Sequence, residues 1–324
     1  MTTGAPVDPT WLKDCAAELG FAFCGVAEAG FMDSEARQLE SWLNQNLHGE
    51  MAYMANHFDK RVDPTKLVPG ARTVVVLGYN YYPADDAPSR STPKIARYAY
   101  GEDYHFVVKR KGKELLYRMQ EKYGSVEGRV FVDSAPVLER QWAERAGQGW
   151  LGKNTLLLRR DQGSYFFLCE LIVDLAFEPD PPVKDFCGTC RRCIDACPTD
   201  AIADDGYLLD ASRCISYLTI ELKSAIPASF GESLEGWAFG CDICQEVCPW
   251  NRFARPHEEP AFEPSPTLAG MGPADWQALT DETFREVFRR SAVKRKGHEG
   301  LQSTLRLLKT NGQNGTEPKT SDQA

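Results

Sequence analysis

The sequence lacks three features that would each point to a familiar class of protein. No uninterrupted apolar run approaches the length that spans a membrane, which argues against a transmembrane helix. No Gly-x-Gly-x-x-Gly turn follows an expected strand and no P-loop is present, so a nucleotide-binding fold is not supported. Positive charge is scarce, because 37 Lys and Arg face 46 Asp and Glu, for a net charge of −9. This balance argues against broad non-specific affinity for nucleic acid but leaves room for a local basic face.

The start of the chain also lacks the basic, apolar and small-residue pattern of a secretory signal peptide. With 324 residues, the chain is far above the size at which a domain needs disulfide staples. Its 11 cysteines therefore predict reduced thiols in the cytoplasm rather than a secreted protein. We expect a monomer without membrane association.

Cysteine is the residue in which the sequence is rich, and the spacing of one group is informative. Cys187, Cys190, Cys193 and Cys197, followed by Pro198, make the run C-x2-C-x2-C-x3-C-P. This run is typical of bacterial ferredoxins that bind 4Fe–4S clusters. The first three thiolates bind one cluster, and the fourth points away from it and serves a second cluster. The run therefore predicts another group of cysteines in the chain.

A second run supplies that group. It reads Cys241-x2-Cys244-x3-Cys248-Pro249 and has one thiolate fewer than the first run. Cys214, which stands alone between the two runs, makes up the deficit and gives the eight thiolates that two 4Fe–4S clusters need. The crossing rule then predicts two ligand sets, which are Cys187, Cys190, Cys193 and Cys248 for one cluster and Cys197, Cys214, Cys241 and Cys244 for the other.

Two other interpretations use the same cysteines. Two zinc sites of four thiolates each would also take C-x2-C pairs, although zinc sites rarely need two interlocked runs that end in Cys-Pro. A disulfide framework suits the size and the expected compartment less well. The remaining cysteines, Cys15, Cys24 and Cys169, lie in apolar or helical contexts and are expected to be core residues.

Up to about residue 180, the sequence alternates expected helices and strands, which favours an α/β (α+β) sheet domain. Residues 73–79 form a β-branched run without alternation, as expected for a strand buried on both faces. The expected helices lie at 8–20, 33–47, 105–123 and 137–146. The expected strands lie at 21–27, 73–79 and 128–133, with a β-hairpin over 154–160 and 164–175 and an exposed loop over 83–93.

A proline-rich break at 178–182 separates this part from the cysteine-rich part. We predict an α/β catalytic domain over 1–182, a ferredoxin-like module with two clusters over 183–254, a short helical extension over 255–311 and a disordered tail over 312–324. Within the extension, residues 255–275 are expected to be irregular, and helices are expected at 281–291 and 298–309.

Asp133 and two basic stretches are further candidates for function. Asp133 follows an expected strand, at the end where ligands bind in open α/β sheets, and a carboxylate there can act as a proton donor. From position alone, an N-cap role for the next helix is the stronger interpretation. The basic stretches, at 109–118 and 289–296, are either solvated faces or binding surfaces.

Two clusters joined to a much larger domain predict a redox enzyme that the clusters feed with electrons. The residues alone do not identify its terminal acceptor. A non-catalytic electron carrier, whose large domain docks partner proteins, is the alternative, and an added redox chromophore would separate the two.

Several segments, in their order and spacing, resemble the epoxyqueuosine reductase family, which are cobalamin-dependent enzymes of queuosine biosynthesis. They are residues 60–62, 101–105, 132–136, 143–147, 152–154, 187–202, 213–219 and 240–251. The resemblance covers about residues 10–300 and includes all eight expected cluster ligands. It implies an oxidoreductase that removes the epoxide oxygen of epoxyqueuosine in the wobble position of tRNA anticodons, giving queuosine and water.

The resemblance also implies the cofactors. A cobalamin is expected in the sheet domain close to one of two 4Fe–4S clusters, and a low-potential donor of the flavodoxin or ferredoxin type is expected to supply electrons. Asp133 matches the family's proton donor, which reverses the preference for an N-cap role. The residues implied at the cobalamin are Arg61, Ala96, Asp133, Lys153, Asn154, Leu157 and Leu168.

For the tRNA, the resemblance implies contacts from Arg140, Ser216, Tyr217 and Thr219. Longer members continue into a C-terminal helical-repeat domain that helps to hold tRNA, and this sequence departs from them by ending at residue 324. The two basic stretches are therefore expected to contact tRNA. A corrinoid reductive dehalogenase, which combines the same cofactors but usually carries an export signal, is the alternative enzyme.

Overall fold

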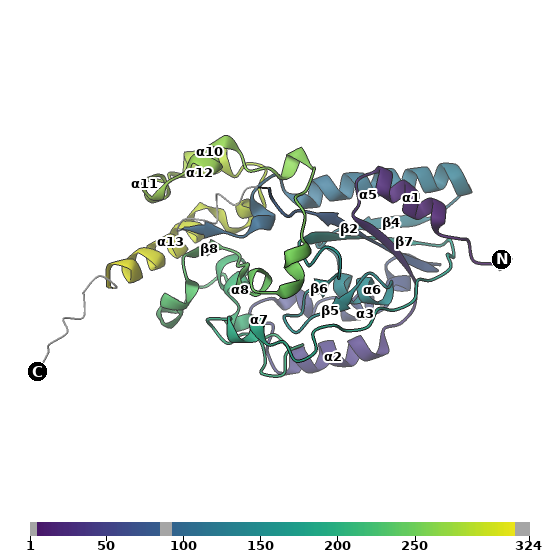
Figure 1. The fold of residues 1–324 in the computed structure, drawn as a ribbon, viewed down its shortest axis with the longest axis horizontal. Coiled ribbons are helices and arrows are strands. Elements are labelled where there is room, and N and C mark those ends of the chain that lie inside the picture. The colour runs from purple at the N-terminus through teal and green to yellow at the C-terminus, as the bar shows by residue number, and fades with distance from the viewer. Residues whose placement is uncertain (1–4, 85–92, 315–324) are drawn as a thin grey trace, which may run out of the picture.

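A four-stranded antiparallel sheet forms the centre of the larger part of the molecule (Figure 1). The computed structural model describes residues 5–84 and 93–314. The strands are β1 (Phe23–Glu28), β2 (Thr73–Asn80), β4 (Gly128–Phe131) and β7 (Phe166–Val173), in the spatial order β1-β2-β7-β4. Every neighbouring pair is antiparallel. The predicted mixed class is confirmed, and the antiparallel pairing makes it the α+β form.

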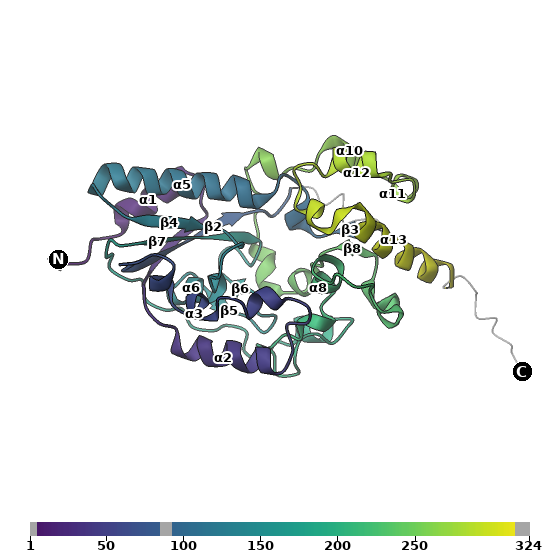
Figure 2. The same cartoon turned by 180° about the vertical axis from the view of Figure 1, so that it is seen from behind.

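Helices cover both faces of this sheet (Figures 1 and 2). On one face lie α1 (Thr10–Glu18) and α5 (Tyr104–Tyr123), and on the other lie α2 (Asp33–Asn44), α3 (Phe58–Arg61) and α6 (Glu139–Arg145). β2 is buried from Thr73 to Tyr79, which confirms the strand predicted to be covered on both faces. Gly112 lets α5 approach the sheet closely, since a Cβ there would lie 2.7 Å from Val130 and 2.8 Å from Cys169.

The β-hairpin predicted over 154–160 and 164–175 is wrong. β6 (Leu157–Leu158) pairs with β5 (Trp150–Leu151), and β7 lies in the main sheet between β2 and β4. An isolated bridge between Arg159 and Gly163 closes the predicted turn. The long apolar β7 buries both of its faces in the sheet, which a short two-stranded hairpin would not achieve.

The cysteine-rich part consists of short elements joined by loops. α7 (Arg192–Asp195) and α9 (Ile243–Glu246) begin next to Cys-x2-Cys pairs and contact each other, and α8 (Ile215–Ile220) follows Cys214. β8 (Trp237–Phe239) pairs in parallel with β3 (Lys94–Ile95). The short 3-10 helices are η1 (Ala52–Met54), η2 (Pro64–Lys66), η3 (Arg97–Ala99), η4 (Ala211–Arg213), η5 (Ala228–Phe230), η6 (Glu232–Leu234), η7 (Pro249–Phe253), η8 (Pro260–Phe262) and η9 (Ala292–Lys296).

The C-terminal part is more helical than the sequence predicted. α12 (Asp281–Val287) and α13 (Gly297–Asn314) confirm two expected helices, whereas α10 (Pro266–Gly270) and α11 (Pro273–Gln277) correct the irregular segment expected over 255–275. Residues 312–314 belong to α13, so the predicted disordered tail does not start at 312. Residues 315–324, like most of the loop predicted over 83–93, lie outside the described residues.

Segment 94–100 links the sheet part to the C-terminal half. Ile95, Ala99 and Tyr100 share one hydrophobic core with β8, α12 and α13. Arg97 is buried and its Nη1 lies 3.1 Å from Asp242 Oδ2 and 2.8 Å from Glu246 Oε1. The predicted domain boundaries therefore stay a prediction, because this segment of the first part packs with the others. In the described ranges, no helix is both long and apolar enough to cross a bilayer.

Candidate active site and cysteine sites

A cavity of about 790 Å³ lies between the sheet and the C-terminal half. Its lining comes from segment 53–61, from residues 133–141, and from β6, β7 and residues just before them. Tyr81, Tyr98, Tyr104, His105, Glu221, Gln245 and Arg295 complete it. Its volume is within the range of sites that bind small molecules and cofactors.

Asp133 lines this cavity and is held by groups from two helices, α5 and α6. Its Oδ2 accepts a hydrogen bond from the Tyr104 hydroxyl at 2.5 Å and lies 3.4 Å from His105 Nε2. Its backbone N–H donates to Glu139 Oε1. The φ of Asp133 is 54°, a left-handed conformation that is uncommon outside glycine and is often found at functional sites. This turn presents the carboxylate to the cavity just beyond the end of β4.

His105 and Asp133 form a charged pair. Burial opposes the charge of His105, but hydrogen bonds to Asp103 and Asp133 outweigh it and raise the pKa of His105 to about 9. Burial favours the neutral form of Asp133, but hydrogen bonds from His105 and Tyr104 hold the pKa of Asp133 below its usual value. At neutral pH the proton therefore resides on His105, beside an ionised Asp133.

Arg61 is a second polar group that faces the cavity with unmet bonding capacity. Its Nη2 donates to the Tyr53 carbonyl at 2.8 Å, and the side chain is 7% exposed. Its buried Nε has no hydrogen-bond partner within the described part of the chain. A buried N–H of this kind needs an acceptor, which a polar cofactor can supply.

The structure separates the residues expected at the cobalamin into two groups. Leu157 and Leu168 line the cavity, together with Arg61 and Asp133. Ala96 does not line it, because its side chain is buried against Gly240. Lys153 and Asn154 also lie elsewhere, and they are described with the cysteines below.

One set of cysteines surrounds a small cavity of about 200 Å³. Cys187, Cys190, Cys193 and Cys248 all line it. Lys153 and Asn154 line the same cavity, and Lys153 Nζ donates to the carbonyls of Gly188 and Cys190 at 2.8 and 3.0 Å. Both side chains therefore lie beside the first set of cysteines, and their expected contact with the cobalamin stays a prediction.

The other set of cysteines is gathered nearby. Cys197 is close enough to Cys214 to act on its ionisation, and Cys214 acts on the ionisation of both Cys241 and Cys244. Burial raises the pKa of Cys244 well above that of a free thiol. Gln245, the next residue, lines the large cavity, so this set lies beside it. All eleven cysteines are free thiols in the structure.

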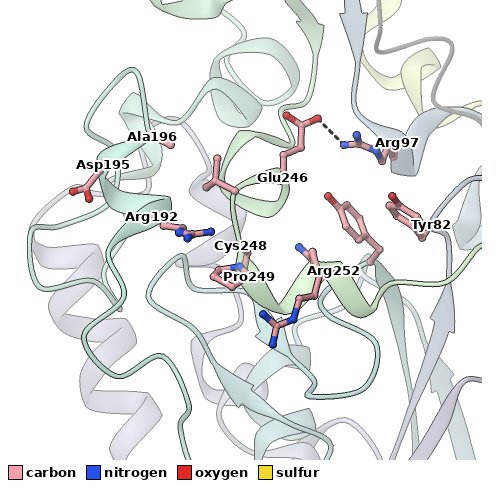
Figure 3. A pocket seen from close by; sticks show the side chains of 12 residues that line it. Tyr82, Arg97, Arg192, Asp195, Ala196, Glu246, Cys248, Pro249 and Arg252 are labelled. Carbon is pink, nitrogen blue, oxygen red and sulfur yellow. Dashed lines mark hydrogen bonds and ion pairs between the residues drawn. The ribbon is translucent and has the colours of Figure 1, made fainter.

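A third pocket, of about 910 Å³, opens next to Cys248, one of the first set of cysteines (Figure 3). Arg192 and Arg252 line it together with Cys248 and Pro249, and the Arg97–Glu246 ion pair forms its far wall. Phe186 and Phe253, each 37% exposed, are nearby in the chain. The protein therefore presents cationic and aromatic side chains beside one cysteine site.

Comparisons with known proteins decide the family. Residues 61–134 match the family model for epoxyqueuosine reductase (QueG, DUF1730), and residues 186–251 match the 4Fe-4S double cluster binding domain. An epoxyqueuosine reductase of Cyclobacterium marinum is 60% identical over 300 residues, covering 92% of this chain and 96% of its own length. This chain belongs to the epoxyqueuosine reductase family. Membership in this family favours an iron–sulfur oxidoreductase over the three alternatives, which were zinc sites, a reductive dehalogenase and a non-catalytic electron carrier.

Solved structures of epoxyqueuosine reductases share the fold. One, in complex with an epoxyqueuosine-modified stem loop of tRNA-Tyr, has a TM-score of 0.84 at 30% identity, covering 95% of this chain and 82% of that chain. Another, from Bacillus subtilis with its catalytic aspartate loop swung out of the active site, has a TM-score of 0.85 at 29% identity and the same coverage.

Of the residues expected to contact tRNA in this epoxyqueuosine reductase family member, Arg140 lines the cavity and is exposed. Tyr217 and Thr219 do not reach solvent, being 5% and 0% exposed, which corrects their expected role. Tyr217 accepts a hydrogen bond from Glu50 N, and Thr219 donates to the Ile215 carbonyl and accepts from Gly240 N. Tyr217 thus joins α8 to segment 49–50 of the first part, and Thr219 joins α8 to Gly240. Ser216 is half-buried beside Cys214.

The two basic stretches also contain some residues that are available for binding and some that are paired with carboxylates. Lys111 pairs with Glu259 and Arg118 with Glu18 and Glu114, so neither is available on a flat binding face. Lys109, Arg110 and Lys113 line a shallow pocket beside His105 and Phe106. In the second stretch, Arg295 lines the large cavity and pairs with Glu221 at 2.8 Å.

Sequence reasoning missed several groups around Asp133. Tyr104 and His105 lie in segment 101–105, which resembles the family, but the resemblance assigns no role to either side chain. Glu139 lies six residues after Asp133, with no local pattern that points to the cavity. Arg295 belonged to a predicted basic patch, and the fold alone turns it toward Asp133.

Proposed function

We propose that this protein reduces epoxyqueuosine to queuosine in tRNA. The observation that carries the proposal is a cavity lined by Asp133, Tyr104, His105 and Arg61, in a chain that belongs to the epoxyqueuosine reductase family. Removing the epoxide oxygen as water breaks both of its C–O bonds, leaves a carbon–carbon double bond, and consumes two electrons and two protons. The chain must therefore supply both electrons and protons at one site.

Two 4Fe–4S clusters are proposed to bind the two cysteine sets. The first set, Cys187, Cys190, Cys193 and Cys248, lines one cavity. The second set, Cys197, Cys214, Cys241 and Cys244, gathers next to Gln245 of the large cavity. Clusters of this kind transfer one electron at a time at low potential. Trp150 Nε1 donates toward Cys187 Sγ at 3.5 Å and Ala201 N toward Cys197 Sγ at 3.4 Å, as suits anionic sulfur ligands.

A cobalamin is proposed to occupy the large cavity. The residues fit, because the cavity offers apolar contacts from Leu157 and Leu168 and an unpaired buried N–H from Arg61. When bound there, cobalamin supplies a strongly reducing cobalt centre. Arg61 is proposed to donate its Nε–H to the cofactor, and Leu157 and Leu168 to exclude water from one side of it.

Asp133 is proposed to deliver a proton to the departing epoxide oxygen. The proton reaches it from His105, which is protonated at neutral pH and lies 3.4 Å away. Tyr104 and the backbone of the left-handed turn fix the direction of the carboxylate. Arg140, exposed at the same cavity, is proposed to contact the tRNA.

A nucleoside assay tests this function. Protein purified without oxygen is reconstituted with iron and sulfide, given cobalamin and a strong reductant, and incubated with tRNA that carries epoxyqueuosine. Digestion and mass spectrometry should show the loss of one oxygen from the modified nucleoside, and the loss should depend on cobalamin. Protein that contains both clusters and cobalamin but leaves epoxyqueuosine intact would refute the proposed substrate.

Lys109, Arg110 and Lys113 are proposed to hold tRNA beside the cavity. They surround Phe106, which is 75% exposed and can stack on a base. Changing the three cations to Gln should weaken tRNA binding about 10-fold or more at low salt, because binding to phosphates releases counterions. The slope of log affinity against log salt should also fall by about one for each phosphate that the variant no longer binds. Filter binding or fluorescence anisotropy at several salt concentrations measures both.

Lys122→Gln is the matched control, since Lys122 lies exposed near the other end of the same helix and contacts Trp11. Its affinity and salt slope should equal those of the wild type. Equal affinities for the triple variant and the wild type would remove this surface from the tRNA site and leave the second basic stretch as the candidate.

An acidic electron carrier of the flavodoxin or ferredoxin type is proposed to dock at the pocket beside Cys248. Arg192 and Arg252 line that pocket, and its two carboxylates, Asp195 and Glu246, pair with Arg191 and Arg97. The two guanidinium groups therefore give this face local positive charge in an acidic protein. Changing both to Glu should slow turnover driven by such a carrier by about 10-fold or more at low salt. Turnover driven by dithionite should not change, because a small reductant needs no docking surface.

Arg285→Glu, on the exposed face of α12, is the control for the added negative charge. Equal losses with carrier and dithionite would mean that the Arg192 and Arg252 changes damage the cluster rather than the docking surface.

We further propose that the protein works as a monomer in the reducing cytoplasm, where eight ligand thiols stay available to the clusters. Sedimentation of the reconstituted protein checks the monomer.

A further inference from the structure

Two glutamates stand behind Asp133 and have no part in the function proposed so far. Glu139 opens α6, lines the cavity and accepts the backbone N–H of Asp133. Glu170 lies on β7, opposite Phe131 of β4, and is 0% exposed. Its neighbours Cys169 and Leu171 face the α5 side of the sheet, so Glu170 faces the α6 side, toward Glu139.

Glu170 is buried without a compensating cation. Its carboxyl has no hydrogen-bonded cation in the described ranges, and the group that acts on it most strongly after burial is Glu139. Two ionised carboxylates cannot share such a site, because burial and mutual repulsion both oppose the second charge. The pair must therefore hold protons.

The pKa values of the Glu139 and Glu170 carboxyls are raised, as this geometry requires. Burial and the charge of Asp133 raise the pKa of Glu139 to about 8, and burial and Glu139 raise the pKa of Glu170 well above its usual range. The titratable and charged groups that face Glu139 or its neighbour Asp133 come from six elements. They are Tyr53 of η1, Tyr98 of η3, Tyr104 and His105 of α5, Arg140 of α6, Glu170 of β7 and Arg295 of η9. At neutral pH, the site thus stores a proton on Glu139 in addition to the one on His105.

The proton demand of epoxide removal matches this store. The departing oxygen needs two protons to leave as water, and the His105–Asp133 pair holds one. We propose that Glu139, backed by Glu170, supplies the second proton to the oxygen by way of Asp133, a role that rests on the proposed reduction of epoxyqueuosine. The two electrons come from the clusters, and bulk water reprotonates the glutamates through the open cavity after the product leaves.

The simpler alternative is that Glu139 only fixes the Asp133 turn by accepting its N–H. Glu139→Gln distinguishes the two roles, since the amide oxygen still accepts that bond but the side chain no longer holds an acidic proton. Glu144→Gln is the matched control on the same helix, because Glu144 likewise accepts a backbone N–H, from Leu151 at 3.1 Å, and lies away from the cavity.

The first readout needs no turnover. Infrared spectra of the protein without substrate should contain a protonated-carboxyl band that is lost with a midpoint near pH 8, and Glu139→Gln should remove it while Glu144→Gln leaves it. The second readout is the rate of queuosine formation against pH. The wild-type rate should fall as pH rises through about 8, since the stored proton is lost there.

Glu139→Gln should lower the rate at pH 7 by about 10- to 100-fold, less than the full loss of a positioned acid, because water in the open cavity can still supply the second proton. Its remaining alkaline limb should move toward the pKa of His105, about 9. Glu139→Asp should recover part of the rate. A carboxyl band that still titrates near pH 8 in Glu139→Gln, or an unchanged rate and pH profile, would overturn the role, while wild-type queuosine formation would keep the proposed function standing. A wild type that forms no queuosine at any pH would overturn both.

Discussion

Replacing Asp133 with Asn should lower the rate of queuosine formation by about 10²–10⁴-fold. Asn keeps the size of the side chain and can still accept from Tyr104, but it cannot hold or pass on a proton. Oxygen leaving an opened epoxide carries developing alkoxide charge, so the loss of the positioned acid acts on the transition state. Single-turnover assays with reconstituted protein and mass spectrometry of the digested tRNA measure the effect.

A second signature should accompany that loss. Asp133 is one of two carboxylates that raise the pKa of His105 to about 9, so Asp133→Asn should lower the pKa of His105 while the pairing with Asp103 at 2.7 Å remains. An NMR titration of the ring protons reports this directly. Asp174→Asn is the control, because Asp174 also accepts a backbone N–H, from Glu127 at 2.9 Å, at the far end of the sheet. A rate within a few-fold of wild type in Asp133→Asn would show that another group protonates the oxygen.

Replacing the cysteines expected to bind the clusters should lower both the iron content and the turnover of the protein. Double variants should show which cysteines share a cluster. With the crossed assignment, Cys197 and Cys241 serve the same cluster, so Cys197→Ala with Cys241→Ala should keep about half of the iron. Cys248 and Cys241 serve different clusters, so the corresponding double variant should lose nearly all of it. Turnover should fall to background in both cases, because the path for electrons is broken.

The uncrossed assignment predicts the opposite order. It places Cys197 with the first three cysteines of its run and Cys248 with Cys241, which would exchange the iron contents of the two double variants. Iron and sulfide analysis with the visible spectrum distinguishes the patterns. Cys24→Ala is the control, since this cysteine lies on β1 in the sheet and should leave both clusters intact.

Sequence patterns predicted those parts of the fold that depend on residues close together in the chain. The spacing of Cys187 to Cys197 predicted the double-cluster domain, because three thiolates in one short loop reach one cluster without help from the rest of the chain. The β-branched run from Thr73 to Tyr79 predicted a strand buried on both faces, because only a central strand can bury every residue. The hairpin over 154–175 failed, since strand partners are chosen by long-range packing.

The composition of the site depended on contacts between distant residues. Tyr104 and Asp133 are 29 residues apart, and the position of α5 against β4 brings them together. Lys153 and Asn154 turn toward the cysteines because their loop crosses the cluster cavity, which no spacing shows. The resemblance implied that Tyr217 and Thr219 contact tRNA, yet their helix is buried against segment 49–50 and Gly240.

By itself, the sequence determined a 4Fe-4S double-cluster domain with eight cysteines at the expected spacing, a part of mixed helices and strands, and the motifs of an epoxyqueuosine reductase, because spacing and periodicity act over a few residues. Tertiary structure alone decided how the protons are distributed. The ionisation of Asp133, His105, Glu139 and Glu170 depends on burial and on charges that four separate elements bring within reach. Electrostatic interactions of this kind depend on distances through space, and those exist only once the chain has folded.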